Sequence, residues 1–302
     1  MRLRVLLSSL FIILILNACK PGADLTPTAP FVVEKTPTQP SSEATFTPLP
    51  TSTPHSSPTP TMLPCRQEGG VIVEGQIESK LVHNPFEFLI YLPPCYQQEP
   101  ERYYPVLYLI HGQSFKQDQW ERLGADEIAD RLIAEGEISP FIVVMPRVIE
   151  VIIDEQPPDA KFGQAMVDEM IPYIDETYRT IPDREFRAVG GLSRGAAWAL
   201  HLSLSRWDLF GIFGAHSLPI FLTDSPQVRS WLDAIPKDSY PRVYIDVADQ
   251  DLKTVRKSTE WFRKILMEKD IPFEFHEYPG IHNEEYWSAH LEEYIRFYSQ
   301  EW

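Results

Sequence analysis

Basic residues are scarce in this sequence. Lys and Arg number 27 against 43 Asp and Glu, which leaves a formal net charge of −16 over 302 residues. Proteins that bind nucleic acid through its phosphates need a basic surface. The composition therefore argues against a nucleic-acid partner, while a hydrophobic content of 43% is enough for a folded core.

Long hydrophobic runs are almost as scarce. The extended run at residues 5–16 is shorter than the roughly 20 residues that span a bilayer, and Arg2 and Arg4 precede it. A basic start and a short apolar segment are typical of a signal peptide. The end of this run and the residues after it read Leu16-Asn17-Ala18-Cys19, which resembles the lipobox of bacterial lipoproteins. The resemblance implies cleavage before Cys19 and lipidation of that cysteine. We predict a signal peptide over residues 1–18 and an exported bacterial protein that a lipid holds at the cell surface or on the outer face of the membrane; ordinary secretion is the alternative.

Residues 19–64 are dominated by Pro and Thr and contain few apolar residues. Proline favours extended polyproline II conformations, and so few apolar groups cannot form a core. We predict a disordered linker that holds a catalytic domain, residues 65–302, away from a membrane surface.

Cysteine is limited to three residues, Cys19, Cys65 and Cys95. If Cys19 carries a lipid, the other two remain as a pair in an exported protein, and a disulfide between them is expected. The alternative is two free thiols, which oxidising surroundings disfavour. Two cysteines without clustered histidines make a poor zinc site, so no metal is expected.

Apolar runs and helical patterns alternate from residue 65 onward. Alternation over this length predicts an α/β fold with a mostly parallel sheet covered by helices on both faces. The expected strands cover residues 71–77, 86–92, 106–110, 141–145, 186–189, 210–215, 243–247 and 273–278, and the expected helices cover residues 163–178, 196–202, 254–267 and 284–298.

The most informative motif is Gly191-x-Ser193-x-Gly195. A short apolar strand precedes it and a run of strong helix formers follows, as in the sharp strand-to-helix turn that exposes a nucleophilic serine. Small neighbours are needed there because the turn crowds the backbone. A merely structural glycine-rich turn is the alternative.

Two further loops at strand ends offer partners for Ser193. Asp249 and Asp251 follow the strand at 243–247, and either carboxylate is a candidate to orient a catalytic imidazole, with Asp251 favoured. His282 lies in the loop between the last strand and the last helix, where a general base is expected. The order Ser193, Asp251, His282 is that of the α/β-hydrolases.

The loop after the strand at 106–110 begins His111-Gly112-Gln113. A loop in this place supplies one backbone N–H of the oxyanion hole in α/β-hydrolases. We therefore expect Gln113 and Arg194 to donate their backbone N–H groups to the oxyanion, and His111 to shape the loop. Trp120 and Trp287 are candidates to line a substrate pocket, with core packing as the alternative for each.

These motifs together resemble the esterase D-like family of α/β-hydrolases, which includes enterochelin esterase, feruloyl esterase and S-formylglutathione hydrolase. The resemblance covers about residues 70–300 and implies Ser193 as nucleophile, Asp251 as acid and His282 as base. The chain departs from the family where residues 113–116 replace a more glycine-rich loop. The resemblance therefore does not predict the shape of the acyl pocket. The matching stretches are residues 104–112, Trp120, residues 142–146, residues 190–195, and residues 280–282 with Trp287.

The sequence therefore predicts a serine esterase that cleaves a small-molecule or polysaccharide-linked carboxylic ester through an acyl-enzyme. Such chemistry needs no metal or organic cofactor. Two alternatives use the same residues differently. An acyltransferase would pass the acyl group to an alcohol instead of water, and a non-catalytic surface lipoprotein would keep the fold as a binding module.

Overall fold

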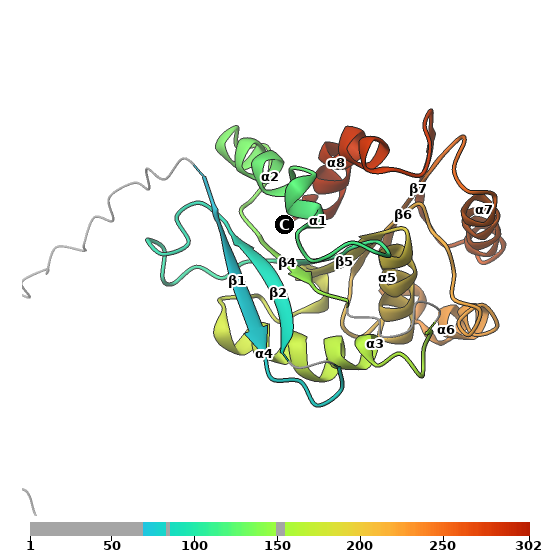
Figure 1. Cartoon of the computed structure of the whole chain (residues 1–302), viewed down its shortest axis with the longest axis horizontal. Coiled ribbons are helices and arrows are strands. Elements are labelled where there is room, and N and C mark those ends of the chain that lie inside the picture. Colours follow the sequence, from blue (N-terminus) through green and yellow to red (C-terminus); the bar gives the residue numbers. More distant parts are fainter. Residues whose placement is uncertain (1–68, 83–84, 149–154) are drawn as a thin grey trace, which may run out of the picture. The chain divides into compact units, whose positions relative to one another are not determined.

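The computed structural model describes residues 69–82, 85–148 and 155–302. These residues form one eight-stranded sheet of order β1-β2-β4-β3-β5-β6-β7-β8 (Figure 1). Strand β2 pairs antiparallel with β1 and β4, and the pairs from β4 to β8 are parallel. The chain thus has the predicted α/β-hydrolase fold. The strands are β1 Val71–Ile77, β2 Phe86–Leu92, β3 Val106–Ile110, β4 Ile142–Pro146, β5 Arg187–Leu192, β6 Ile212–His216, β7 Arg242–Ala248 and β8 Glu274–Tyr278.

The central strands are buried on both faces. Every residue of β3, β4, β5 and β6 is buried, which explains why their sequences show unbroken apolar runs instead of an alternating pattern. Strand β8 at the edge is partly exposed along its whole length, and its two glutamates, Glu274 and Glu277, are the most exposed residues. The predicted strands are confirmed: three have the predicted bounds, and the ends of the other five shift by at most three residues.

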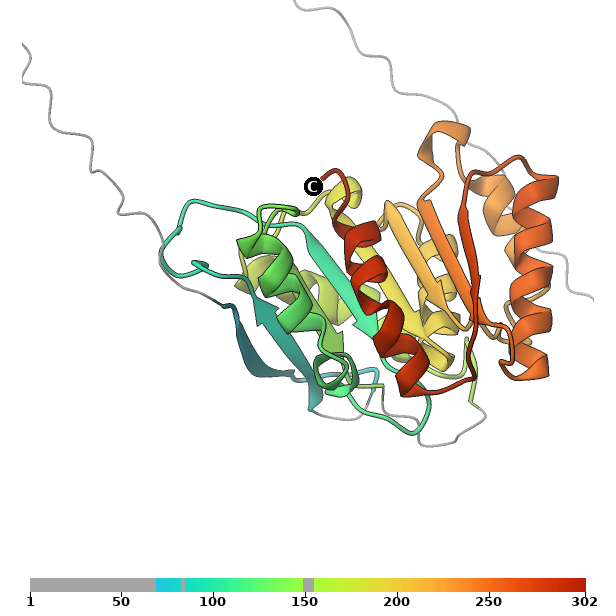
Figure 2. The ribbon, with the colours of Figure 1, turned by 90° about the horizontal axis from the view of Figure 1, so that it is seen from above.

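Helices cover both faces of the sheet. Figure 2 shows α2 and α8 lying across one face, where they share a hydrophobic cluster with α1. The opposite face packs against the segment from α3 to α4 and against α5, α6 and α7. The helices are α1 Gln119–Arg122, α2 Ala125–Ala134, α3 Phe162–Ala165, α4 Ile171–Thr177, α5 Arg194–Ser205, α6 Val228–Ala234, α7 Lys253–Glu268 and α8 Glu284–Ser299.

The helix expected over residues 163–178 is not a regular α-helix. A π-helical turn, Met166–Met170, separates α3 from α4. Pro172 occupies the first turn of α4 and has no N–H to donate to the carbonyl four residues earlier. The helix widens by one residue at this point, as helices do where a ladder bond is missing.

Two glycines of the central sheet bring α8 close to the strands. Gly190 in β5 and Gly214 in β6 are direct neighbours in the sheet. A Cβ at either position would lie 1.8 or 1.9 Å from the hydroxyl oxygen of Tyr298 on α8. That hydroxyl lies 2.9 Å from Nε2 of the buried His216. Glycine is required here because only a bare backbone leaves room for the tyrosine.

The N-terminal predictions fall outside the described residues. The signal peptide, Cys19, the linker and Cys65 all lie in residues 1–68, while Cys95 follows β2 and is buried. Within the described ranges, no helix has the length and apolar character to cross a membrane. The same ranges contain no group of three or more His, Cys, Asp or Glu side chains placed to hold a metal ion.

Candidate active site

Ser193 occupies the sharp turn between β5 and α5. Its backbone has φ 51° and ψ −126°, a conformation that is rare for a residue with a side chain. The neighbouring glycines permit this turn. A Cβ on Gly191 would lie 2.3 Å from the backbone of Gly195, and one on Gly195 would lie 2.1 Å from the Ile110 carbonyl oxygen. The Ser193 N–H donates to the His216 carbonyl at 2.8 Å, which fixes the turn against β6.

Ser193, His282 and Asp251 are brought together at the carboxyl ends of β5, β8 and β7. The distance from Ser193 Oγ to His282 Nε2 is 2.9 Å, and His282 Nδ1 lies 2.7 Å from Asp251 Oδ1. With Nδ1–H donating to the carboxylate, Nε2 carries the lone pair that can take the serine proton. The three side chains form one continuous hydrogen-bonded chain.

Asp249 has a different place in the same loop. Its Oδ1 accepts the N–H of Gly280 at 2.9 Å, and its own N–H donates to the Tyr278 carbonyl at 2.8 Å. These bonds tie the loop after β7 to the loop that carries His282. Of the two carboxylates considered from the sequence, Asp251 contacts the imidazole, and Asp249 supports the loop that holds it.

The Asp251 carboxylate is buried and well bonded. Oδ2 accepts the hydroxyl of Ser217 at 2.7 Å, and Oδ1 also accepts the Leu252 N–H at 2.6 Å. Burial alone would raise the pKa of Asp251, but the hydrogen bonds from His282 and Ser217 outweigh burial and hold this pKa below its usual value. The group is therefore charged at neutral pH, with its negative charge next to the imidazole.

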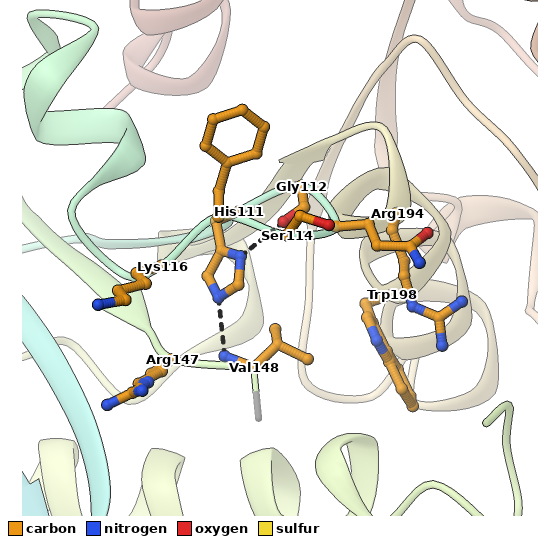
Figure 3. A pocket seen from close by; sticks show the side chains of 10 residues that line it. His111, Gly112, Ser114, Lys116, Arg147, Val148, Arg194 and Trp198 are labelled. Carbon is orange, nitrogen blue, oxygen red and sulfur yellow. Dashed lines mark hydrogen bonds between the residues drawn. The ribbon is translucent and has the colours of Figure 1, made fainter. Parts of the chain in front are cut away.

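His111 shapes the loop after β3. Figure 3 shows its ring between two backbone groups, with Nδ1 at 2.8 Å from the Gly112 carbonyl and Nε2 accepting the Val148 N–H at 2.9 Å. Burial lowers the pKa of His111 to about 4. The neutral ring thus holds the Gly112 carbonyl in place. This carbonyl and the Gln113 N–H belong to the same peptide group, so the ring also fixes the direction of that N–H.

A cavity of about 270 Å³ opens beside this loop. Gln113 and Arg194, the two expected oxyanion donors, both line it. Its lining also includes the side chains of Lys116 and Arg147, and Figure 3 shows these two on one side of His111 with Arg194 on the other. Among the residues that the structure describes, the lining has three cationic side chains and no carboxylate, in a chain whose net charge is strongly negative.

The structure places both candidate pocket tryptophans in the core. Trp120 is fully buried, and its indole N–H donates to the Ile110 carbonyl at 3.1 Å. Trp287 is 3% exposed, and its N–H donates to Ser217 Oγ at 3.1 Å. The Trp287 ring also meets His282 edge-to-face at 4.9 Å. The position of Trp120 favours core packing over a contact with substrate. Trp287 is also in the core, and its ring packs against the imidazole of His282.

Sequence reasoning missed two supporting residues. Gln119 is fully buried, accepts the Gly112 N–H at 2.9 Å, and bonds Glu284 at the start of α8 at 3.1 Å. Ser217 contacts Asp251 from the end of β6. Neither Gln119 nor Ser217 belongs to a motif. Glu284 is distant in the chain from Gln119, and Asp251 is distant from Ser217; only Gly112 is near its partner in sequence. No pattern of neighbouring residues could have revealed these contacts.

Comparison with protein families gives one match. The model of a family described as "Putative esterase" matches residues 79–298, which is most of the chain. All three residues of the Ser193–His282–Asp251 chain lie inside the matched region.

Curated relatives match over part of their length. An endo-1,4-beta-xylanase/feruloyl esterase of Xylanibacter ruminicola is 38% identical over 141 residues, which are 41% of this chain and 18% of that protein. Esterase Rv1288 of Mycobacterium tuberculosis is 30% identical over 140 residues, which are 44% of this chain and 29% of that protein. The chain therefore spans less than a third of the length of these relatives.

Solved structures match over nearly their whole length. A ferulic acid esterase superposes with a TM-score of 0.68 at 26% identity, covering 77% of this chain and 98% of that one. The S-formylglutathione hydrolase FrmB of Staphylococcus aureus superposes with a TM-score of 0.65 at 17% identity, covering 78% of this chain and 98% of that one. The second likeness shows the shared fold alone.

Proposed function

The chain belongs to the family described as "Putative esterase", and on that premise we propose that this carboxylic-ester hydrolase works through a Ser193–His282–Asp251 triad. One observation carries the proposal. The serine hydroxyl, the imidazole and the buried carboxylate are linked by contacts of 2.9 and 2.7 Å at the edge of the sheet where the strand ends converge.

The reaction follows from these contacts. His282 Nε2 takes the proton of Ser193 as Oγ attacks the ester carbonyl, and the charged Asp251 stabilises the imidazolium that forms. The backbone N–H groups of Gln113 and Arg194 bind the oxyanion. His282 then gives the proton to the leaving alcohol. Water, activated by the same imidazole, releases the acyl group from Ser193.

The test uses the full chain with wild type, Ser193→Ala and His282→Ala. We expect turnover of 4-nitrophenyl acetate and labelling by a fluorophosphonate probe in the wild type, loss of both in Ser193→Ala, and a loss of turnover in His282→Ala. Ser230→Ala is the matched control, because this exposed serine lies on α6 and bonds only the nearby Gln227 carbonyl among the described residues. Full turnover in Ser193→Ala would contradict the proposal.

Feruloyl esters are the first natural substrates to assay. The Xylanibacter relative and the first solved structure above are named for this activity, and such esters include polysaccharide-linked forms. Release of ferulate from a feruloylated polysaccharide would support this substrate, and turnover of simple esters alone would direct the search elsewhere.

We further propose that the protein is exported and anchored by a lipid on Cys19, with a disulfide between Cys65 and Cys95. The support is the sequence of residues 1–19 and the pairing of the remaining two cysteines. Cys19→Ala should move the protein from the membrane fraction to the soluble fraction of the producing bacterium. Mass spectrometry of the purified chain with and without reductant tests the disulfide.

A further inference from the structure

Ser217 directly follows β6 and is completely buried. Its hydroxyl donates to Asp251 Oδ2 at 2.7 Å, and it accepts the indole N–H of Trp287 at 3.1 Å. We propose that Ser217 is a positioning residue for ester hydrolysis, which acts on the Asp251 carboxylate and does not touch substrate. This inference rests on the triad proposed above.

The two oxygens of Asp251 have separate partners. Oδ1 receives the His282 Nδ1–H at 2.7 Å and the Leu252 N–H at 2.6 Å, while Oδ2 receives the Ser217 hydroxyl. Turning the carboxylate about its bond to Cβ would break bonds at both oxygens. The Ser217 hydroxyl therefore keeps Oδ1 directed at the imidazole and limits the orientations that the His282 ring can adopt.

Trp287 decides which way the Ser217 hydroxyl points. An indole N–H can only donate, so it occupies a lone pair of the serine oxygen and leaves the serine hydrogen for Asp251. The same ring lies edge-to-face against His282, with centroids 4.9 Å apart. One tryptophan thus supports the base directly and the acid through Ser217.

The backbone at Ser217 points to a functional constraint. Its φ is 56°, in the left-handed region where glycine is favoured. Its N–H donates to the Asp246 carbonyl at 2.9 Å, and the carbonyl of the preceding residue, His216, receives the Ser193 N–H at 2.8 Å. A serine in this strained position supplies a hydroxyl that glycine would lack, next to the backbone that holds the nucleophile.

The experiment measures kcat and KM for 4-nitrophenyl acetate in the full chain. Ser217→Ala and Ser217→Gly both remove the hydroxyl, and glycine also relieves the strain at φ 56°. We expect each to lower kcat about tenfold, the effect of one hydrogen bond to a charged acceptor, and to leave KM unchanged. Ser203→Ala is the matched control, because this buried serine on α5 bonds only the Leu200 carbonyl among the described residues.

A double-mutant cycle then separates positioning from general damage. If Ser217 acts through Asp251, Ser217→Ala should have almost no effect on kcat in the Asp251→Ala background. An equal loss in that background, or wild-type kcat in both Ser217 variants, would overturn the proposal. Trp287→Phe keeps an aromatic ring, though a smaller one, and removes the N–H, and we expect it to lower kcat two- to fivefold.

Urea unfolding of each variant shows that it is folded under assay conditions, and Ser217→Gly serves if the alanine variant does not fold. Ser193→Ala is measured in parallel. Retained turnover in Ser193→Ala would refute the triad itself, whereas lost turnover there with unaffected Ser217 variants would refute only the positioning role.

Discussion

Acidification should weaken the loop that carries Gln113, the proposed oxyanion donor, because His111 is buried as a neutral imidazole. Its ring accepts the Val148 N–H through Nε2, which a protonated ring cannot do. The perturbation we consider is a fall in pH from 7 to 4, compared between the wild type and His111→Asn, which does not titrate.

The sign of this pH dependence follows from the pKa of His111 in the folded and in the unfolded chain. Burial lowers the pKa of His111 in the folded protein from the ordinary 6.5 to about 4. Above pH 6.5 the ring is neutral in both states and contributes no pH dependence. Between these values the unfolded chain binds a proton that the folded chain does not, so stability falls as the pH falls. At about 1.4 kcal/mol for each pH unit, the loss amounts to about 3 kcal/mol.

The assay is urea unfolding of both proteins at half-unit steps from pH 7 to pH 4. At pH 7 we expect His111→Asn to be less stable by about 1–3 kcal/mol, because the Val148 N–H loses its buried acceptor. Other titrating groups affect both proteins alike, so the difference between the two isolates His111. We expect the wild type to lose about 3 kcal/mol relative to His111→Asn on reaching pH 4, so that its advantage at pH 7 vanishes or reverses. Parallel curves over the whole range would refute the reasoning.

Two further predictions concern the acid loop and the packing of α8. Asp249→Ala removes the acceptor of the Gly280 N–H, so we expect kcat for 4-nitrophenyl acetate to fall about tenfold or less. Asp251→Ala should lower kcat by about a thousandfold or more, and equal losses in the two variants would contradict the assigned roles. Gly214→Ala places a Cβ 1.9 Å from the Tyr298 hydroxyl oxygen. We expect it to lower the free energy of unfolding by about 1–3 kcal/mol in urea, and an unchanged midpoint would show that the helix moves aside freely.

The sequence by itself determined the class of fold and the order of its elements. Unbroken apolar runs such as residues 106–110 require burial on both faces, and that is where central parallel strands lie. The strand-turn-helix context of Ser193 could also be predicted, because the turn requires small residues directly beside the serine in the sequence. The helices α1, α2 and α6 were not predicted, and the π-helical turn before Pro172 was missed because periodicity alone does not report a single missing hydrogen bond.

Only the tertiary structure decided how the site is assembled. Asp249 and Asp251 follow the same strand, and the turn after it sends one carboxylate to Gly280 and the other to His282. The sequence allowed Trp120 to face a substrate or the core, because an indole suits both, and packing placed it in the core.

The physical reason is the range of the interactions. Strands, helices and tight turns depend on neighbours along the chain, so their signals appear in short stretches of sequence. The contacts of the site join strand ends that are far apart in the chain. His282 is 89 residues from Ser193 and 31 from Asp251, and Ser217 is 70 residues from Trp287. Such pairs become neighbours only when the parallel sheet brings its carboxyl ends to one edge.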